Sequence, residues 1–387
     1  MAKILMINLP YTGHTNPTLG LAKKLVERGH IVDYILSNDW REKIAATGAT
    51  FIPYDNYPND LSFSKAKILC FRAAYETALR IGKDYDIIIY EFLFFLGKSL
   101  GDKLKKPVVR QFTTFALNEN SFTYMADRIM KLNILNRCSV LRSLVTKLFF
   151  APKISMKEND FVKEILFNKP DLNIVYIPRE FQIFENEFED SEYSFVGPSI
   201  CERIETQVIP FHEMKHPIIY VSLGTIFNNN KSFYLKCIKA FCKNSATLIL
   251  SIGSKIKIED FYPLPKNCYV YNHVPQLEVL EQADLFITHG GMNSINEAMY
   301  YGVPMLVFPY ATDQPANADR IAELGLGKRM KTSMSGERIM QSAFEVLEDK
   351  KIRSSVNEMS MKVKAYGGLE QATKLIEKYL NIINYSR

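Results

Sequence analysis

A histidine that follows the first apolar segment is the clearest candidate for acid–base chemistry. His14 lies in the run Pro10-Tyr-Thr-Gly13-His14-Thr-Asn-Pro17, where a strand passes into a helix. Such a turn faces the ligand crevice of a parallel sheet, and an imidazole with an ordinary pKa of about 6.5 accepts a proton at neutral pH. A base of this kind is usually oriented by a carboxylate, and Glu91 ends a later apolar run. The simpler alternatives are a histidine that helps to cap a helix and a polar residue that merely ends a buried strand.

A second segment has the chemistry of an anion site. It reads Asp284-Leu-Phe-Ile-Thr-His289-Gly290-Gly291-Met-Asn293-Ser294-Ile-Asn-Glu297. A strand ends at Thr288, two glycines allow a tight turn, and the following helix points the N–H groups of its first turn back at that turn. A diphosphate there gains backbone hydrogen bonds and the favourable end of the helix dipole. Taken alone, a glycine-rich turn with a capping Asn or Ser is the simpler interpretation.

The elements that must position these residues alternate along the chain. Apolar strands are expected at 4–9, 31–36, 50–52, 87–90, 108–112 and 174–177, and again at 218–222, 247–251, 269–271, 285–288 and 305–308. Helical patterns separate most of them, and from 121 to 167 only helical patterns occur. This alternation predicts parallel sheets with crossover helices. With 387 residues, the chain is expected to form two domains.

Composition narrows the class of protein. Hydrophobic residues make up 47% and charged residues 23% of the chain, which is typical of a soluble globular protein. No signal peptide or membrane-spanning stretch is apparent, so a cytoplasmic location is expected. Six cysteines without a C-x-x-C pair predict neither a disulfide framework nor a zinc site. The net charge of +6 comes from interspersed residues, which argues against a nucleic-acid partner.

One region is more basic than the rest. Between Met125 and Lys163, eight Lys and Arg residues stand among apolar ones such as Leu148, Phe149 and Phe150. Plain amphipathic helices explain this pattern most simply. A weak association with a membrane surface is the alternative.

The segment from Tyr271 to Arg320 resembles the donor-binding signature of the UDP-glycosyltransferase superfamily, particularly its bacterial macrolide and natural-product branch. The matching elements are H-V-P-Q, T-H-G-G-M-N-S-I-N-E, Y-G-V-P and D-Q-P-A-N-A, together with S-L-G-T at 222–225 and G-H-x-x-P at 13–17. The resemblance implies an α/β fold of two Rossmann-like domains that face each other across a cleft, the GT-B fold. We expect an acceptor-binding domain at 1–200, a linker at 201–216 and a nucleotide-sugar-binding domain at 217–387. The last helix could pack back on the first domain.

The resemblance also implies a role for each matching residue. His14 would be the catalytic base and Glu91 its partner. His289, Asn293 and Ser294 would bind the donor phosphates, Glu297 the ribose hydroxyls, Asp313 and Gln314 the sugar hydroxyls, and Gln276 would lie near the nucleotide. The full donor-binding set comprises Gly13, Gly224, Thr225, His273, Val274, Gln276, His289, Gly290, Gly291, Asn293, Ser294, Glu297, Asp313 and Gln314. Two positions depart from the family: Glu91 stands where Asp is usual, and His273 where many relatives carry a base-stacking Trp.

The activity implied is that of an inverting glycosyltransferase. It would move a hexose to a hydroxyl of a small hydrophobic acceptor such as a macrolide antibiotic, a flavonoid or another natural product. The preferred donor would be UDP-glucose. The N-terminus of the helix after Gly291 would stabilise the diphosphate in place of a cation, so neither a metal nor a resident cofactor is expected. The protein would be a monomer or a homodimer. The alternatives are a lipid-linked glycosyltransferase at the membrane surface, a nucleotide-sugar epimerase and a non-catalytic UDP-sugar-binding protein.

Two metal-type motifs are weak. His212-Glu-Met-Lys-His216 matches the H-E-x-x-H of zinc peptidases, but Pro210 and Pro217 flank it and disfavour the continuous helix that this motif needs. Asp84-Tyr-Asp86 has the D-x-D pattern of metal-dependent glycosyltransferases but precedes a strand far in sequence from the anion site. Neither is expected to bind a metal.

Overall fold

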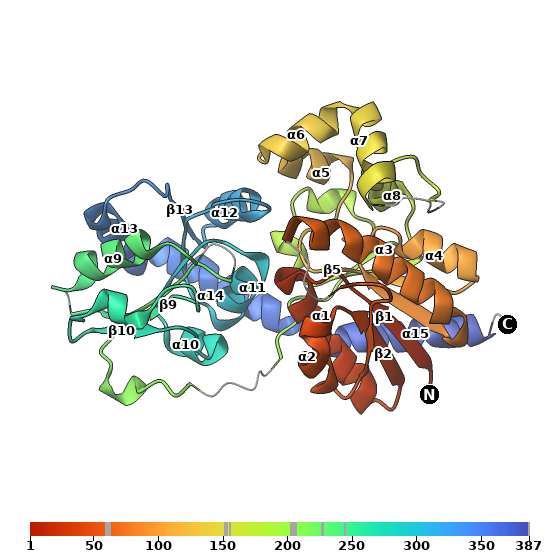
Figure 1. Ribbon diagram of the computed structural model, residues 1–387. Helices are drawn as coiled ribbons and strands as arrows, with labels where there is room; N and C mark the ends of the chain where they lie inside the picture. The colour runs from red at the N-terminus through yellow and green to blue at the C-terminus, as the bar shows by residue number, and fades with distance from the viewer. Residues whose placement is uncertain are drawn as a thin grey trace. The chain divides into compact units, whose positions relative to one another are not determined.

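The computed structural model describes residues 1–58, 63–150, 154, 156–201, 207–225, 228–243 and 245–385. Its contacts divide the chain into two compact units, unit 1 (residues 1–200 and 366–387) and unit 2 (residues 201–365) (Figure 1). Each unit is a parallel sheet with helices around it. The predicted α/β class with two Rossmann-like domains is therefore confirmed.

Unit 1 contains a seven-stranded sheet in the order β3-β2-β1-β4-β5-β6-β7. The strands are β1 (Lys3–Ile7), β2 (Ile31–Leu36), β3 (Thr50–Pro53), β4 (Ile87–Glu91), β5 (Val108–Phe112), β6 (Leu172–Val175) and β7 (Tyr193–Phe195). The central strands are buried on both faces, as their continuous apolar runs require. Because β1, β4 and β5 are parallel neighbours, their carboxyl ends lie side by side.

The helices of unit 1 cover this sheet and fill the connection after β5. They are α1 (Thr12–Glu27), α2 (Arg41–Ala45), α3 (Phe63–Ile81), α4 (Gly97–Leu104), α5 (Glu119–Ala126), α6 (Met130–Arg137), α7 (Ser139–Val145), a π-helical turn η3 (Thr146–Phe150), α8 (Phe161–Phe167) and α15 (Gly368–Tyr385). The helices α5 to α8 occupy the region where the sequence predicted only helical patterns. In Figure 1 they stand above the sheet.

Unit 2 contains a six-stranded sheet in the order β10-β9-β8-β11-β12-β13. Its strands are β8 (Ile218–Ser222), β9 (Thr247–Ser251), β10 (Cys268–Tyr271), β11 (Leu285–Thr288), β12 (Met305–Val307) and β13 (Gly327–Arg329), and its helices are α9 (Lys231–Phe241), α10 (Gln276–Gln282), α11 (Met292–Tyr301), α12 (Gln314–Glu323), α13 (Gly336–Glu348) and α14 (Lys350–Ala365). Here β8, β11 and β12 are parallel neighbours, which brings their following loops to one edge.

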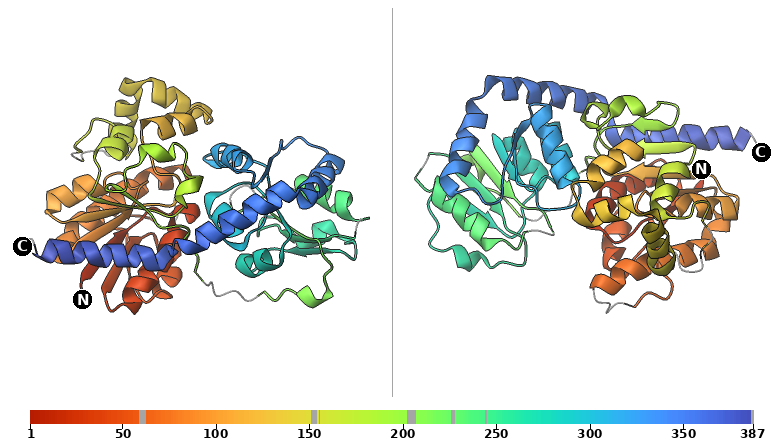
Figure 2. Two further views of the ribbon diagram at one scale, coloured as in Figure 1. Left: turned by 180° about the vertical axis from the view of Figure 1, so that it is seen from behind. Right: turned by 90° about the horizontal axis from the view of Figure 1, so that it is seen from above.

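The C-terminal helix α15 groups with unit 1, although the sequence-based division assigned its residues to the second domain while allowing for such packing. It packs against α1 (Figure 2). Tyr366 Oη donates to Glu180 at 2.8 Å, and Tyr379 Oη donates to Asp171 at 2.9 Å. Among the described residues, no helix combines the length and the apolar composition needed to cross a bilayer.

Candidate active site

The carboxyl ends of β1, β4 and β5 bring three polar side chains together in unit 1. His14 lies in the first turn of α1, Glu91 ends β4, and Thr113 follows β5. His14 Nδ1 lies 2.9 Å from Glu91 Oε1, and the Glu91 side chain is fully buried. The longer side chain of Glu91 therefore reaches the imidazole at hydrogen-bonding distance, although the family usually has Asp here.

Thr113 completes this cluster, and the sequence analysis missed it. Its Oγ1 donates to Glu91 Oε1 at 2.8 Å and lies 3.0 Å from His14 Nδ1. The other carboxylate oxygen of Glu91 accepts a hydrogen bond from the Leu93 backbone N–H at 3.0 Å. One feature of the sequence could have indicated Thr113. It directly follows β5, the strand that pairs with β4, so it lies at the same edge of the sheet as Glu91.

Aromatic side chains surround the imidazole of His14. The ring of Phe92 lies 5.6 Å and the ring of Tyr11 6.4 Å from the imidazole, measured between ring centres. The His14 side chain keeps 26% of its surface exposed. The buried carboxylate binds Nδ1, so in this arrangement Nε2 is the ring nitrogen that can take a proton from a substrate.

In unit 2, β11 passes into α11 through the predicted tight glycine turn. Gly290 has φ +84°, and a Cβ there would lie 2.5 Å from Val307 Cγ1. Gly291 precedes α11, and within the described part of the chain no side chain caps this helix. Asn293 and Ser294 lie in its first turn. The N-terminus of α11 can therefore donate backbone hydrogen bonds to a phosphate group.

His289 is packed between two glycine-containing loops. A Cβ at Gly224, which has φ +71°, would lie 2.5 Å from His289 Cε1, and a Cβ at Gly291 would lie 2.6 Å from His289 Nε2. Burial lowers the pKa of His289 to about 4, against the opposing effect of Asp313. Its buried Nδ1 has no hydrogen-bond partner among the described residues. The side chain is thus a neutral imidazole near neutral pH, and its contact with a phosphate stays a prediction.

The carboxylate predicted to bind ribose is held by the predicted nucleotide-side glutamine. Gln276 Nε2 donates to Glu297 Oε2 at 2.5 Å and to Ser294 Oγ at 3.3 Å. Tyr220 Oη, on β8, donates to Gln276 Oε1 at 3.0 Å, which orients the amide. Tyr220 is a further residue that the sequence analysis did not select, and its signal was its position two residues before Ser222 in a strand neighbouring β11.

The pair predicted to read the sugar lies at the start of α12. Gln314 Oε1 accepts from the backbone N–H groups of Tyr310 and Ala311, so this amide is fixed by the loop before the helix. Asp313 Oδ2 accepts from Asn317 Nδ2 at 3.2 Å, and the same nitrogen donates to Gly290 O at 2.9 Å. Asn317, which had no assigned role, therefore ties Asp313 to the glycine turn.

The remaining predicted donor residues differ in exposure and surroundings. Thr225 and His273 are exposed, and Val274 is buried. A Cβ at Gly13, in α1, would meet no atom within 4 Å.

The metal-type motifs do not form the structures that those sites need. His212 and Glu213 lie in a short 3-10 turn, η6 (Phe211–Glu213), and the helix does not continue to His216, whose Nδ1 lies 2.6 Å from Asp284. Asp86 accepts from the Lys3 N–H at the amino end of β1, opposite the His14 edge. Within the described ranges, no group of three or more His, Cys, Asp or Glu residues could hold a metal ion.

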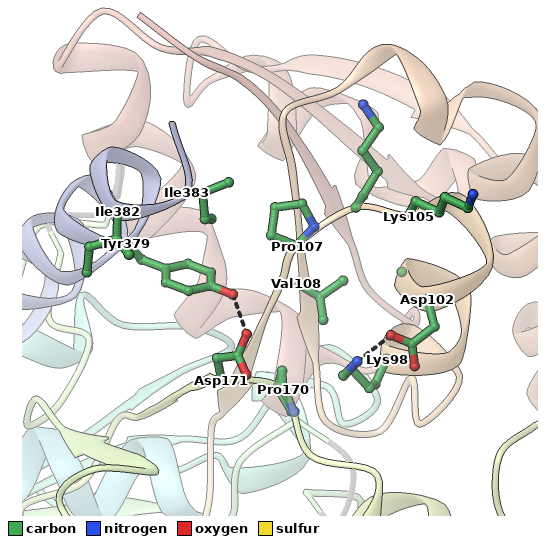
Figure 3. Close-up of a pocket in the computed structure, with 12 residues that line it drawn as sticks. Lys98, Asp102, Lys105, Pro107, Val108, Pro170, Asp171, Tyr379, Ile382 and Ile383 are labelled. Atoms are coloured by element: carbon green, nitrogen blue, oxygen red, sulfur yellow. Dashed lines mark hydrogen bonds and ion pairs between the residues drawn. The ribbon is translucent and has the colours of Figure 1, made fainter. Parts of the chain in front are cut away.

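Unit 1 has a surface hollow at a distance from His14 and Glu91. Its volume is about 540 Å³, and it lies where α15 passes the amino ends of β5 and β6 (Figure 3). Tyr379 and Asp171 meet in it, and Lys98 pairs with Asp102. Ligands of open parallel sheets bind at the carboxyl ends, so we do not assign substrate binding to this hollow.

Comparison with known proteins agrees with the two-domain α/β fold. The family model described as UDP-glucoronosyl and UDP-glucosyl transferase matches residues 197–365. NDP-glycosyltransferase YjiC of Bacillus subtilis is 34% identical over 391 residues, covering 97% of each chain. Two solved structures, the glycotransferase of kitacinnamycin and the calicheamicin glycosyltransferase CalG4, have TM-scores of 0.80 and 0.79, with 28% and 26% identity. The first alignment covers 98% of this chain and 99% of its match, and the second covers 98% of both.

One Rossmann-like unit carries a histidine–carboxylate pair, and the other carries a glycine turn at the N-terminus of a helix. Together with the comparisons, this arrangement defines a nucleotide-sugar-dependent glycosyltransferase of the GT-B class. The chain belongs to the UDP-glycosyltransferase superfamily, alongside bacterial relatives of the natural-product branch.

Proposed function

We propose that this glycosyltransferase transfers glucose from UDP-glucose to a hydroxyl group of a small hydrophobic acceptor, with inversion and without a metal. The observation that carries the proposal is the 2.9 Å contact between His14 Nδ1 and the buried carboxylate of Glu91. The matched family description names UDP-glucosyl transfer, and the two solved relatives are named for kitacinnamycin and calicheamicin. These names support a nucleotide-activated sugar and a natural-product acceptor.

The proposed reaction uses His14 as the base. Nε2 removes the proton from the acceptor hydroxyl, and Glu91 stabilises the imidazolium that forms. The acceptor oxygen then attacks the anomeric carbon from the face opposite the phosphate. The bond from that carbon to the phosphate oxygen breaks, and its electron pair leaves with UDP. The N-terminus of α11 and neutral His289 stabilise the charge that develops on the leaving diphosphate.

The geometry of unit 2 supports the following donor contacts. Glu297 would accept hydrogen bonds from the ribose hydroxyls while Gln276 holds its other side. Asp313 and Gln314 would bind the sugar hydroxyls from the start of α12. Paired carboxylate and amide groups of this kind suit vicinal hydroxyls.

Turnover of His14→Ala tests the proposed base. UDP release from UDP-glucose, measured with a panel of phenolic and macrolide acceptors, should fall by roughly a thousandfold in the variant. His212→Ala is the matched control, because its side chain is 82% exposed in η6, and it should keep full activity. Undiminished turnover in His14→Ala would reject His14 as the base.

Calorimetry with UDP tests the donor site separately. Wild type and His14→Ala should bind UDP equally, since the phosphate and ribose contacts belong to unit 2. Absence of binding to UDP and to other nucleoside diphosphates would reject the donor assignment. A product whose anomeric configuration is opposite to that of the donor sugar would support inversion. Full activity in the presence of a chelator would support metal independence.

A second candidate is transfer to a lipid-linked acceptor at a membrane surface. It is favoured by the exposed apolar side chains on α7 and η3. It predicts that turnover requires an acceptor presented in vesicles, whereas the first proposal predicts turnover with dissolved acceptors.

A further inference from the structure

The helical segment formed by α7 and η3 has two faces with different surroundings. Arg142, Thr146 and Phe150 repeat every four residues on one face, and Val140, Leu144 and Leu148 repeat every four residues on the other. Residues at this spacing lie on the same side of a helix. The first set contacts the rest of unit 1, whereas the second set does not become buried.

The inner face fixes the orientation of the segment. Arg142 Nε lies 3.3 Å from Asp160 Oδ1, and both side chains are buried. Thr146 Oγ1 accepts a hydrogen bond from the Phe161 N–H at 3.0 Å. The ring of Phe150 lies 5.0 Å from that of Phe71, on α3, and 5.7 Å from that of Phe161. These contacts turn the opposite side of the segment to solvent.

The outer face is strongly apolar. Val140 is 77%, Leu144 53%, Leu148 60% and the neighbouring Phe149 45% exposed. Figure 1 shows α7 standing above the sheet of unit 1 with α6. Single exposed apolar residues are common on proteins, but a row of them on one helical face marks an interaction surface.

The charge near this face indicates which kind of partner it would bind. Residues 128–157 contain seven Lys and Arg residues and no Asp or Glu. Arg137, before the apolar row, and Lys147, beside Leu148, are exposed. The acidic residues that flank this range are Asp127, which is exposed, Glu158, which is half-buried, and Asp160, which is buried and paired with Arg142. A second copy of the chain would bring like charges together in a two-fold contact, whereas an anionic bilayer supplies the complementary charge.

We propose that this outer face, consisting of Val140, Leu144, Lys147, Leu148 and Phe149, docks the protein reversibly on anionic lipid bilayers together with the exposed Arg137 at the end of α6. The apolar side chains enter the boundary between headgroups and acyl chains while the two basic side chains contact the anionic headgroups. This binding goes beyond glycosyl transfer and does not depend on the identity of the donor. It would place the enzyme where hydrophobic acceptors concentrate.

Vesicle flotation of the full chain tests the proposal. Wild type should float with vesicles of mixed phosphatidylcholine and phosphatidylglycerol, bind phosphatidylcholine vesicles at least about tenfold more weakly, and dissociate as salt is raised. The triple variant Val140→Ser, Leu144→Ser, Leu148→Ser should lose binding by about tenfold or more. Arg137→Gln with Lys147→Gln should do the same and lower the salt dependence.

A matched control replaces three exposed apolar residues elsewhere by serine. They are Val208, Met361 and Ile382, which are 81%, 68% and 53% exposed. This control should float like wild type. Circular dichroism and turnover of a water-soluble acceptor should be unchanged in all variants, which separates lost docking from lost folding and from failure of the proposed reaction.

Three results would overturn the proposal. The first is wild type that binds neither kind of vesicle. The second is a wild-type dimer, seen by light scattering, that the outer-face triple variant abolishes while vesicle binding is absent. The third is a raised KM for a dissolved acceptor in the triple variant without any change in flotation, because the face would then belong to acceptor binding.

Discussion

The imidazole of His14 is held by a hydroxyl as well as by a carboxylate. Thr113 Oγ1 donates to the same oxygen of Glu91 that binds His14 Nδ1. Hydrogen bonds to charged groups contribute roughly 1.5–3 kcal/mol, and the loss of this one lets the carboxylate turn away from the imidazole. Thr113→Val should therefore lower kcat by about tenfold or more with little change in KM for the donor.

Steady-state kinetics over a range of pH check the role of Thr113. The valine variant should also shift the acidic limb of the kcat/KM profile, because the carboxylate that interacts with His14 would be less well oriented. Thr113→Ser keeps the hydroxyl and should restore most of the rate. Equal losses in the serine and valine variants would contradict a positioning role.

His289 should make stability depend on pH in unit 2. Its pKa falls from 6.5 to about 4 because of burial, so between these values the unfolded chain binds a proton that the folded chain does not. The contribution of His289 to the free energy of unfolding is fully present above pH 6.5. It is lost as the pH falls towards 4, by a total on the order of 3 kcal/mol.

Denaturant unfolding at several pH values tests this linkage. His289→Gln should flatten the fall in unfolding free energy over that interval, whereas the exposed His212→Gln should not. An unchanged slope in His289→Gln would show that His289 does not carry the effect.

At the scale of elements, a buried ion pair helps to hold the connection after β5. Arg142, on α7, pairs with Asp160, which also accepts from the Lys163 N–H at the start of α8. Removing the arginine leaves a buried carboxylate without its counter-charge, which typically costs about 3–5 kcal/mol. Arg142→Met should therefore destabilise α6 to α8 strongly.

Limited proteolysis and denaturant unfolding measure that effect. Asp160→Asn retains a capping side chain without the charge. The double variant Arg142→Met, Asp160→Asn should be more stable than Arg142→Met alone. If the double variant is the less stable of the two, the ion pair is not the source of the loss.

Strands were predictable where their composition is distinctive. The runs at 285–288 and 247–251 are apolar on both faces, and the structure has β11 and β9 with these bounds. The sequence analysis missed β7 and β13, which have three residues each. Gly327-Lys-Arg329 has no strand pattern, and it becomes a strand because β12 offers a free edge for pairing.

For the whole molecule, the C-terminal helix should decide the stability of unit 1. Helix α15 buries Leu369, Ala372, Ile376 and Leu380, and Glu370 pairs with Arg28 of α1. Deletion of residues 366–387 would expose the apolar surface that α15 covers. We expect the truncated chain to lose turnover and the cooperative unfolding of unit 1.

Calorimetry distinguishes this local effect from general unfolding. Unit 2 retains all its strands and its α11 turn in the truncated chain, so UDP binding should persist. Loss of both UDP binding and turnover would mean that unit 2 also requires α15.

The sequence by itself determined the α/β class and the residue types of both candidate sites, because periodicity and short motifs are local properties. His14 with Glu91 and the His289–Glu297 segment could be selected in this way. Thr113, Tyr220 and Asn317 could not, because their roles arise from strand order and from side chains distant in sequence. The neutral state of His289 also required the tertiary structure, since burial between two loops sets its pKa.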